Sequence, residues 1–130
     1  MVVGYSLGTG VALELASTCP VGAVLLQAPF VSGRRLLEYW HPELKDDLPP
    51  DVAPFPSIDR ICKVTCPIAV IHGEEDGIVP FAQGEELYAA APEKGGFTAV
   101  QSAGHCNLLL KIGPLHYRKI VEALLLQRKA

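Results

Sequence analysis

The sequence predicts an α/β fold in which a mostly parallel sheet is flanked by helices. Short apolar runs of strand length at residues 23–28, 67–71 and 97–100 alternate with segments of helical periodicity. That alternation is typical of a parallel sheet covered on both faces. The other main observation is a G-x-S-x-G turn at Gly4–Gly8, which follows a short apolar stretch and precedes a helical pattern. A turn in that context presents a serine at the carboxyl end of a strand.

The first half of the chain starts with a strand remnant, the serine turn and a helix. The helix is expected over residues 9–17, where small side chains allow close packing on a sheet and Gly10 permits contact at its start. Pro20 ends this helix. Residues 23–28 are a nearly continuous apolar run, as in a strand buried on both faces, and Pro29 closes it.

Residues 30–57 are interpreted as a cap-like insertion between two core strands. A short helix around residues 34–40 is followed by four prolines between residues 49 and 56, too many for long regular elements. Such a segment can lie over a pocket. The alternative is that its apolar side chains only cover the end of the core. These side chains are Leu36, Leu37, Tyr39, Trp40 and Phe55.

The second half returns to alternating elements. Ser57 is expected to cap a short helix that ends before the strand at 67–71. A proline in the first turn then begins a helix over about residues 80–91. After the last strand, a closing helix is expected from about Pro114, with its apolar side chains at helical spacing toward the sheet.

Composition bounds the kind of protein. With 130 residues and a net charge of −3, the chain has the size of one domain and lacks the basic surface of a nucleic-acid-binding protein. No apolar stretch approaches the roughly 20 residues of a membrane span. The four cysteines are spaced neither for a zinc site nor for a disulfide scaffold. We therefore expect reduced thiols, no metal or other cofactor, and an intracellular location, in the cytoplasm or at the cytoplasmic face of a membrane.

Ser6 is the candidate nucleophile. A serine in a sharp turn crowds its neighbours, so the positions two before and two after it, Gly4 and Gly8, are expected to require glycine. The turn aims the first helix amides at an oxygen beside the serine, which makes the Leu7 amide the expected oxyanion donor. The second donor would come from a loop after an earlier strand, outside this sequence. The alternative is a Gly-Ser-Gly turn without catalytic role.

His105 and Asp76 are the candidate base and acid. Each follows the end of a predicted strand, and open parallel sheets place their sites at that edge. A serine hydroxyl is a weak nucleophile that needs a base within hydrogen-bond reach. The imidazole in turn needs a carboxylate that fixes its tautomer and stabilises its charged form.

Other residues could fill the same roles. Glu74 and Glu75 are rivals for the carboxylate, but they stand closer to the strand end than the His-Gly-x-x-Asp spacing favours. His72 is interpreted as a locally hydrogen-bonded strand-end residue rather than the base. Cys106 is an alternative nucleophile next to the candidate base, but no sharp turn surrounds it.

Five blocks of the sequence together resemble the serine hydrolases among the α/β-hydrolase domain-containing proteins, especially the group that removes palmitate from cysteines of membrane-associated proteins. The resemblance covers nearly all of the chain. It implies that the chain is the C-terminal half of an α/β-hydrolase fold, because the nucleophile of that fold normally follows several strands. The blocks are Gly4–Thr9, Ala28–Gly33, Phe55–Arg60, Ile71–Asp76 and Gly104–Asn107.

The resemblance also implies roles for individual residues. Ser6 would take the acyl group from a thioester, His105 would shuttle the proton, and Asp76 would orient the imidazole. Phe30 and Val31 would lie beside the acyl pocket. The substrate would be an acylated protein or a small acyl ester, and membrane association is not carried over to this chain.

The leading hypothesis is a metal-independent serine hydrolase that cleaves an acyl ester or thioester through an acyl-enzyme. Two alternatives stay open. One is a serine peptidase of the same fold. The other is a truncated, inactive remnant or interaction module. By itself the chain would leave a sheet edge uncovered, which predicts self-association through that edge.

Overall fold

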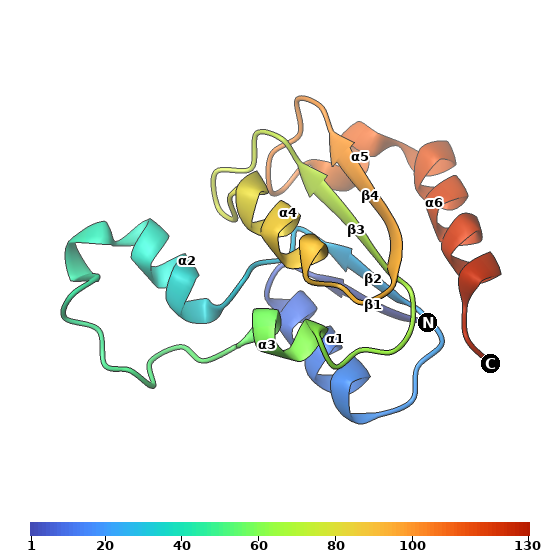
Figure 1. Cartoon of the computed structure of the whole chain (residues 1–130). Coiled ribbons are helices and arrows are strands. Elements are labelled where there is room, and N and C mark those ends of the chain that lie inside the picture. Colours follow the sequence, from blue (N-terminus) through green and yellow to red (C-terminus); the bar gives the residue numbers. More distant parts are fainter.

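Four parallel strands form the centre of the structure, a computed structural model that describes residues 1–130 (Figure 1). Their spatial order along the sheet follows the chain, β1-β2-β3-β4. The predicted α/β class with a parallel sheet is confirmed. The strands are β1 (Val2–Tyr5), β2 (Val24–Gln27), β3 (Ile68–Gly73) and β4 (Lys94–Val100).

Helices cover both faces of the sheet (Figure 1). α1, α3 and α4 pack on one face, and α5 and α6 pack on the other. The helices are α1 (Leu7–Thr18), α2 (Gly33–Trp40), α3 (Ser57–Ile61), α4 (Phe81–Ala89), α5 (Leu108–Ile112) and α6 (Pro114–Gln127), with one 3₁₀ turn, η1 (Pro42–Leu44).

The two central strands carry the core. Every residue of β2 and β3 is buried, as expected for β-branched and aliphatic runs between two helix layers. Because side chains alternate along a strand, Val24 and Leu26 enter the core under α1, whereas Leu25 enters the core under α5 and α6. Each such aliphatic side chain contributes about 1.5–3 kcal/mol on burial. The sheet is thereby fixed from both sides.

Two boundaries and one additional helix differ from the sequence-based prediction. Ser57 does not cap α3: it is the first helical residue, Pro56 holds the capping position, and the Ser57 hydroxyl is buried without a hydrogen-bond partner. The turn at Phe55, whose φ is 25°, lies two residues before the helix start. β4 begins at Lys94 and so includes two glycines that were expected to precede it. A Cβ at Gly95 would lie 2.8 Å from Leu124 Cδ1 and 3.1 Å from the Ile68 backbone, so glycine allows close packing there. The short helix α5 was not predicted, because its five residues are too few to show periodicity.

Residues 30–57 project from one side of the sheet (Figure 1). Ser32 caps α2 by accepting a hydrogen bond from the Arg35 amide. The Arg34 guanidinium donates to the Pro49 carbonyl at 2.6 Å and to the Leu48 carbonyl at 3.3 Å, which holds the proline-rich loop against α2. A role of this segment as a cap over a pocket stays a prediction.

One edge of the sheet is open in this chain. β1 pairs with β2 alone, and several apolar side chains on and next to it are exposed. They are Val3 and Tyr5 of the strand and Leu7, Val11 and Leu15 of α1. Self-association through this edge stays a prediction. None of the helices combines the length and the apolar character needed to cross a membrane.

The glycines around the serine turn differ in what they require. A Cβ at Gly4 would lie 2.6 Å from the Gly8 carbonyl oxygen and 2.8 Å from the Thr9 Cα, so the start of α1 leaves no room for it. A Cβ at Gly8 would meet nothing within 4 Å. The expectation that both positions require glycine is therefore met only at Gly4.

We expect Gly4→Ala to lower the free energy of unfolding by about 1–3 kcal/mol, because backbone atoms must move to admit the methyl group. The matched variant Gly8→Ala should leave it unchanged or raise it by up to about 1 kcal/mol, since alanine favours a helix. Urea unfolding of both variants and the wild type measures the difference. Equal destabilisation by the two substitutions would contradict the steric assignment.

Candidate active site

Ser6 occupies the sharp turn between β1 and α1. Its backbone angles are φ 55° and ψ −120°, in a region that costs about 1–3 kcal/mol for a residue with a side chain. Hydrogen bonds hold the turn in place: the Ser6 amide donates to the Gln27 carbonyl at 2.9 Å, and the Thr9 hydroxyl donates to the Ser6 carbonyl at 2.6 Å. The turn therefore presents the Ser6 hydroxyl at the carboxyl edge of the sheet.

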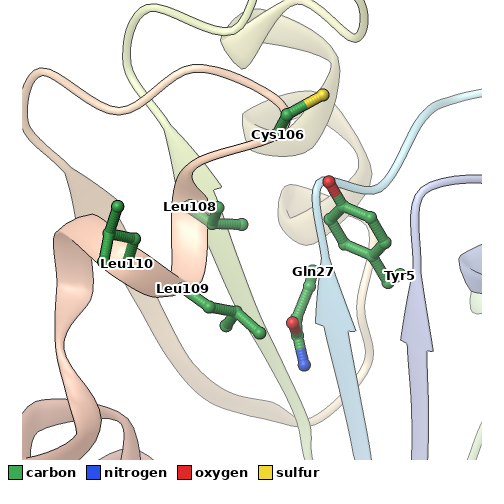
Figure 2. Close-up of a pocket in the computed structure, with 6 residues that line it drawn as sticks. All are labelled: Tyr5, Gln27, Cys106, Leu108, Leu109 and Leu110. Carbon is green, nitrogen blue, oxygen red and sulfur yellow. The ribbon is translucent and has the colours of Figure 1, made fainter.

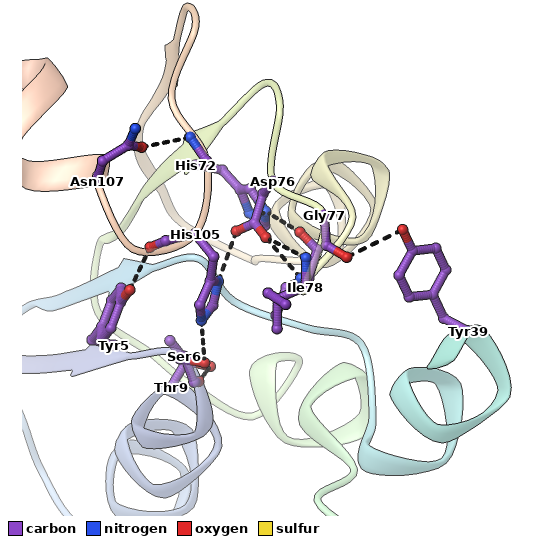
Figure 3. Close-up of polar contacts among 12 residues, drawn as sticks. Tyr5, Ser6, Thr9, Tyr39, His72, Asp76, Gly77, Ile78, His105 and Asn107 are labelled. Atoms are coloured by element: carbon purple, nitrogen blue, oxygen red, sulfur yellow. Dashed lines mark hydrogen bonds and ion pairs between the residues drawn. The ribbon is translucent and has the colours of Figure 1, made fainter. Parts of the chain in front are cut away.

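The structure brings Ser6, His105 and Asp76 together (Figure 3). His105 Nε2 lies 2.9 Å from Ser6 Oγ, and His105 Nδ1 lies 2.9 Å from Asp76 Oδ2. A carboxylate only accepts hydrogen bonds, so Nδ1 carries the proton and Nε2 is free to accept the Ser6 hydroxyl proton. The three side chains thus form a hydrogen-bonded chain from nucleophile to base to acid.

A close contact between two loops sets the distance from Asp76 to His105. The loop after β3 is joined to the end of β4 and the loop that follows it by backbone hydrogen bonds, from Glu74 to Val100 at 3.0 Å and from Glu75 to Ala103 at 2.9 Å. A Cβ at Gly73 would lie 2.3 Å from the Ala103 carbonyl oxygen. Glycine in the His-Gly-x-x-Asp block therefore allows the two loops to touch.

The Asp76 carboxylate is held by the backbone that follows it. Oδ1 accepts hydrogen bonds from the amides of Ile78 at 2.9 Å and Val79 at 2.8 Å, while Oδ2 faces His105. The carboxylate is buried. Two amide donors and one imidazole donor take the place of the water that the buried carboxylate has lost.

The rival residues take no part in the hydrogen-bonded chain from Ser6 to Asp76. Glu74 and Glu75 are exposed, and so is Cys106. The buried His72 directs Nε2 to the Val79 carbonyl at 2.8 Å, whereas its Nδ1 has no hydrogen-bond partner. Burial lowers the pKa of His72, which keeps the ring neutral.

Two residues that the sequence did not indicate support His105. The Tyr5 hydroxyl donates a hydrogen bond to the His105 carbonyl, and the two rings are stacked with centroids 5.4 Å apart. Partial burial raises the pKa of Tyr5, so the phenol remains a donor. The Asn107 side chain accepts a hydrogen bond from the Gly104 amide at 2.7 Å. Tyr5 directly precedes Ser6, but nothing in its spacing predicts a contact with residue 105.

Two aromatic residues of α2 contact the loop that carries Asp76. The Trp40 indole N–H donates to the Ile78 carbonyl at 2.8 Å, and the Tyr39 hydroxyl donates to the Gly77 carbonyl at 3.4 Å. The segment 30–57 therefore touches the backbone next to the candidate acid (Figure 3).

The remaining predicted residues are placed as follows. Leu7 is the first residue of α1, where a helix amide has no intrahelical partner and can donate to an oxyanion. Phe30 and Val31 are buried, Phe30 against Phe55 with ring centroids 6.2 Å apart, and the Val31 amide donates to the Gln83 side chain at 3.1 Å. Their role in substrate binding stays a prediction.

A mostly apolar cavity of about 300 Å³ lies between the ends of β1 and β2 and the segment that follows His105 (Figure 2). The sequence did not indicate it, although the Leu108–Leu110 run follows the histidine block directly. Its lining residues are Tyr5, Gln27, Cys106, Leu108, Leu109 and Leu110. No group of three or more His, Cys, Asp or Glu side chains is arranged to hold a metal ion.

No family model matches the chain, but known proteins are similar to it in sequence or in fold. The α/β hydrolase domain-containing proteins 17C of mouse and of human are each 37% identical over 110 residues, which is 85% of this chain and 33% and 32% of those proteins. Human α/β hydrolase domain-containing protein 17B is 34% identical over 110 residues, or 36% of its length. The chain thus spans about a third of the length of the curated relatives it matches.

Solved structures share the fold at low sequence identity. The esterase domain of a Rhodothermus marinus protein is 19% identical with a TM-score of 0.61, covering 96% of this chain and 56% of its own. A cold-adapted esterase from an Arctic intertidal metagenomic library is 18% identical with a TM-score of 0.65, covering 98% of this chain and 46% of its own. The predicted resemblance to α/β-hydrolase domain-containing proteins is confirmed, and so is the α/β-hydrolase fold, of which this chain covers a part.

The buried, neutral His72 predicts how stability depends on pH. Because its pKa is lowered in the folded state, the unfolded chain binds more protons below about pH 6.5. The contribution of neutral His72 to the free energy of unfolding should therefore be fully present above that pH. It should fall as the pH drops toward the folded-state pKa, by at most about 1.4 kcal/mol per pH unit. Urea unfolding at pH 7.5, 6.5 and 5.5 measures the loss. His72→Gln should reduce it, whereas substitution of the exposed His116 should not, and equal slopes in the wild type and His72→Gln would contradict the assignment.

Proposed function

We propose that this chain carries the nucleophile, base and acid of a metal-independent serine hydrolase that cleaves an acyl ester or thioester. The observation that carries the proposal is the continuous hydrogen-bonded chain Ser6–His105–Asp76, with 2.9 Å at each step. The similarity to α/β hydrolase domain-containing proteins supports it. Ser6 in a strained turn at the start of a helix supports it independently, since strained backbone clusters at functional sites.

The geometry supports a two-step mechanism. Ser6 Oγ attacks the carbonyl carbon of the substrate while its proton passes to His105 Nε2, and Asp76 stabilises the imidazolium. The negative oxygen of the tetrahedral intermediate is stabilised by the Leu7 amide. Collapse of the intermediate breaks the bond to the thiol or alcohol, which leaves with the proton from His105. A water molecule, deprotonated by His105, then hydrolyses the acyl-Ser6 ester and restores the hydroxyl.

For the substrate, we propose a long-chain acyl thioester such as palmitoyl-cysteine in a protein. The resemblance of five sequence blocks to the depalmitoylating group supports this choice. Phe30 and Val31 stay the proposed neighbours of the acyl chain. Because both are buried and Phe55 packs against Phe30, an acyl chain would reach them only after side chains around them moved.

A fluorophosphonate probe tests the reaction class. It should label the full-length protein at Ser6, and Ser6→Ala should abolish labelling without unfolding the protein. A long-chain acyl thioester should be turned over by the wild type alone. Absence of labelling where a control serine hydrolase reacts would refute the hydrolase. Turnover of a peptide amide but not of the thioester would instead support the peptidase alternative.

A further inference from the structure

The position of Asp76 depends on the four-residue segment Asp76–Val79, called the acid loop below. Asp76 Oδ1 is held by the amides of Ile78 and Val79, so the carboxylate moves if the backbone of the acid loop moves. The loop lacks regular secondary structure of its own. Some other group must therefore fix it to the rest of the fold.

His72 provides a buried attachment for the acid loop. Its Nε2 lies 2.8 Å from the Val79 carbonyl oxygen, and a carbonyl only accepts hydrogen bonds, so Nε2 carries the proton. The same Val79 donates its amide to Asp76 Oδ1 at 2.8 Å. One peptide unit on each side of Val79 Cα thus joins His72 to the carboxylate. His72 Nε2 is 3.6 Å from Asp76 Oδ2, too far for a direct hydrogen bond, and the link runs through the backbone.

α4 fixes the orientation of the His72 ring. A Cβ at Gly84 would lie 2.3 Å from Nδ1, so the helix backbone stands directly against the ring. Phe81 of the same helix meets the ring edge to face, with centroids 5.7 Å apart. Glycine at an interior helix position costs about 0.5–1 kcal/mol relative to alanine. Close contact with His72 accounts for a glycine at this place.

His72 does more than fill the core. An aliphatic side chain would fill the same space without leaving the ring Nδ1 buried and unpartnered, a polar atom that costs free energy. What an aliphatic side chain lacks is a donor for the Val79 carbonyl. The unpartnered Nδ1 and the helix glycine at Gly84 both lower the stability of the fold. Both are explained if the hydrogen bond from His72 to the Val79 carbonyl is needed to hold the acid loop.

We propose that His72 is a positioning residue that acts through Val79 to hold Asp76 in line with His105. The proposal rests on the proposed serine hydrolase function of Ser6. His72 touches neither Ser6 nor a reacting atom. Its contribution is to restrict the acid loop so that the carboxylate meets the imidazole at hydrogen-bond distance.

Four variants of the full-length protein test the proposal. His72→Leu removes the donor and keeps the bulk, and His72→Gln keeps an N–H group that can reach the Val79 carbonyl. Gly84→Ala leaves His72 in the sequence, but the added methyl group displaces its ring from the position next to α4. His116→Leu, at an exposed site on α6, is the matched control. The first readout is the rate of Ser6 labelling by a fluorophosphonate. The second is the downfield proton NMR signal of the His105 N–H that is bonded to Asp76.

We expect His72→Leu and Gly84→Ala to label about 10- to 100-fold more slowly and to lose or broaden the downfield signal, because small displacements of catalytic groups have effects of that size. His72→Gln should retain most of the rate and the signal, and His116→Leu should retain both. Slower labelling of Gly84→Ala could not be explained by a weaker helix, because alanine favours a helix more than glycine does. It would therefore indicate that the His72 ring has been displaced.

The opposite results would overturn the proposal. If folded His72→Leu keeps the wild-type rate and signal, the ring only fills space. If His72→Leu does not fold, the other two variants decide. The proposal is overturned if Gly84→Ala keeps the wild-type labelling rate and signal. It is also overturned if His72→Gln loses as much rate and signal as Gly84→Ala. If the wild type itself is not labelled, the hydrolase proposal fails. The NMR signal still tests whether His72 positions Asp76.

Discussion

The contact between the loops after β3 and β4 is the constraint on which the site depends. Parallel pairing brings the ends of neighbouring strands to the same edge of the sheet, but strand spacing alone does not place two side chains within hydrogen-bond distance. Gly73 lets the Ala103 backbone approach, and the Glu75 amide bonds to the Ala103 carbonyl. With the loops joined in this way, Asp76 and His105 start from fixed backbone positions, and their side chains meet at hydrogen-bond distance.

Backbone groups do most of the positioning in this site. The acid loop uses its amides to hold Asp76 and its carbonyls to accept hydrogen bonds from outside the loop. Trp40, in the segment 30–57, donates to the Ile78 carbonyl, and His72 donates to the Val79 carbonyl from the core. The His105 loop is held in a similar way, with Tyr5 bonded to its carbonyl. Both loops are thus irregular in secondary structure yet well anchored, as the proposed catalytic role would require.

Sequence reasoning reached what depends on local patterns. Ser6, Asp76 and His105 follow strand ends within short motifs, so the rule that sites form at the carboxyl edge of a parallel sheet was enough to group them. It missed Tyr5 and Trp40, because their partners lie 100 and 38 residues away and no spacing encodes such contacts. Gly8 was misjudged for the opposite reason, since the motif suggested crowding that the three-dimensional surroundings do not impose.

At Ser6, the stability of the fold and the presence of the hydroxyl group make opposite demands on one residue. Its positive φ is one that glycine adopts freely, so glycine there would relieve the turn while removing the hydroxyl. A lineage selected only for resistance to heat or denaturant would drift toward that replacement, and a lineage that keeps the serine accepts a less stable fold. If Ser6 is the proposed nucleophile, the strained turn is retained together with the hydroxyl.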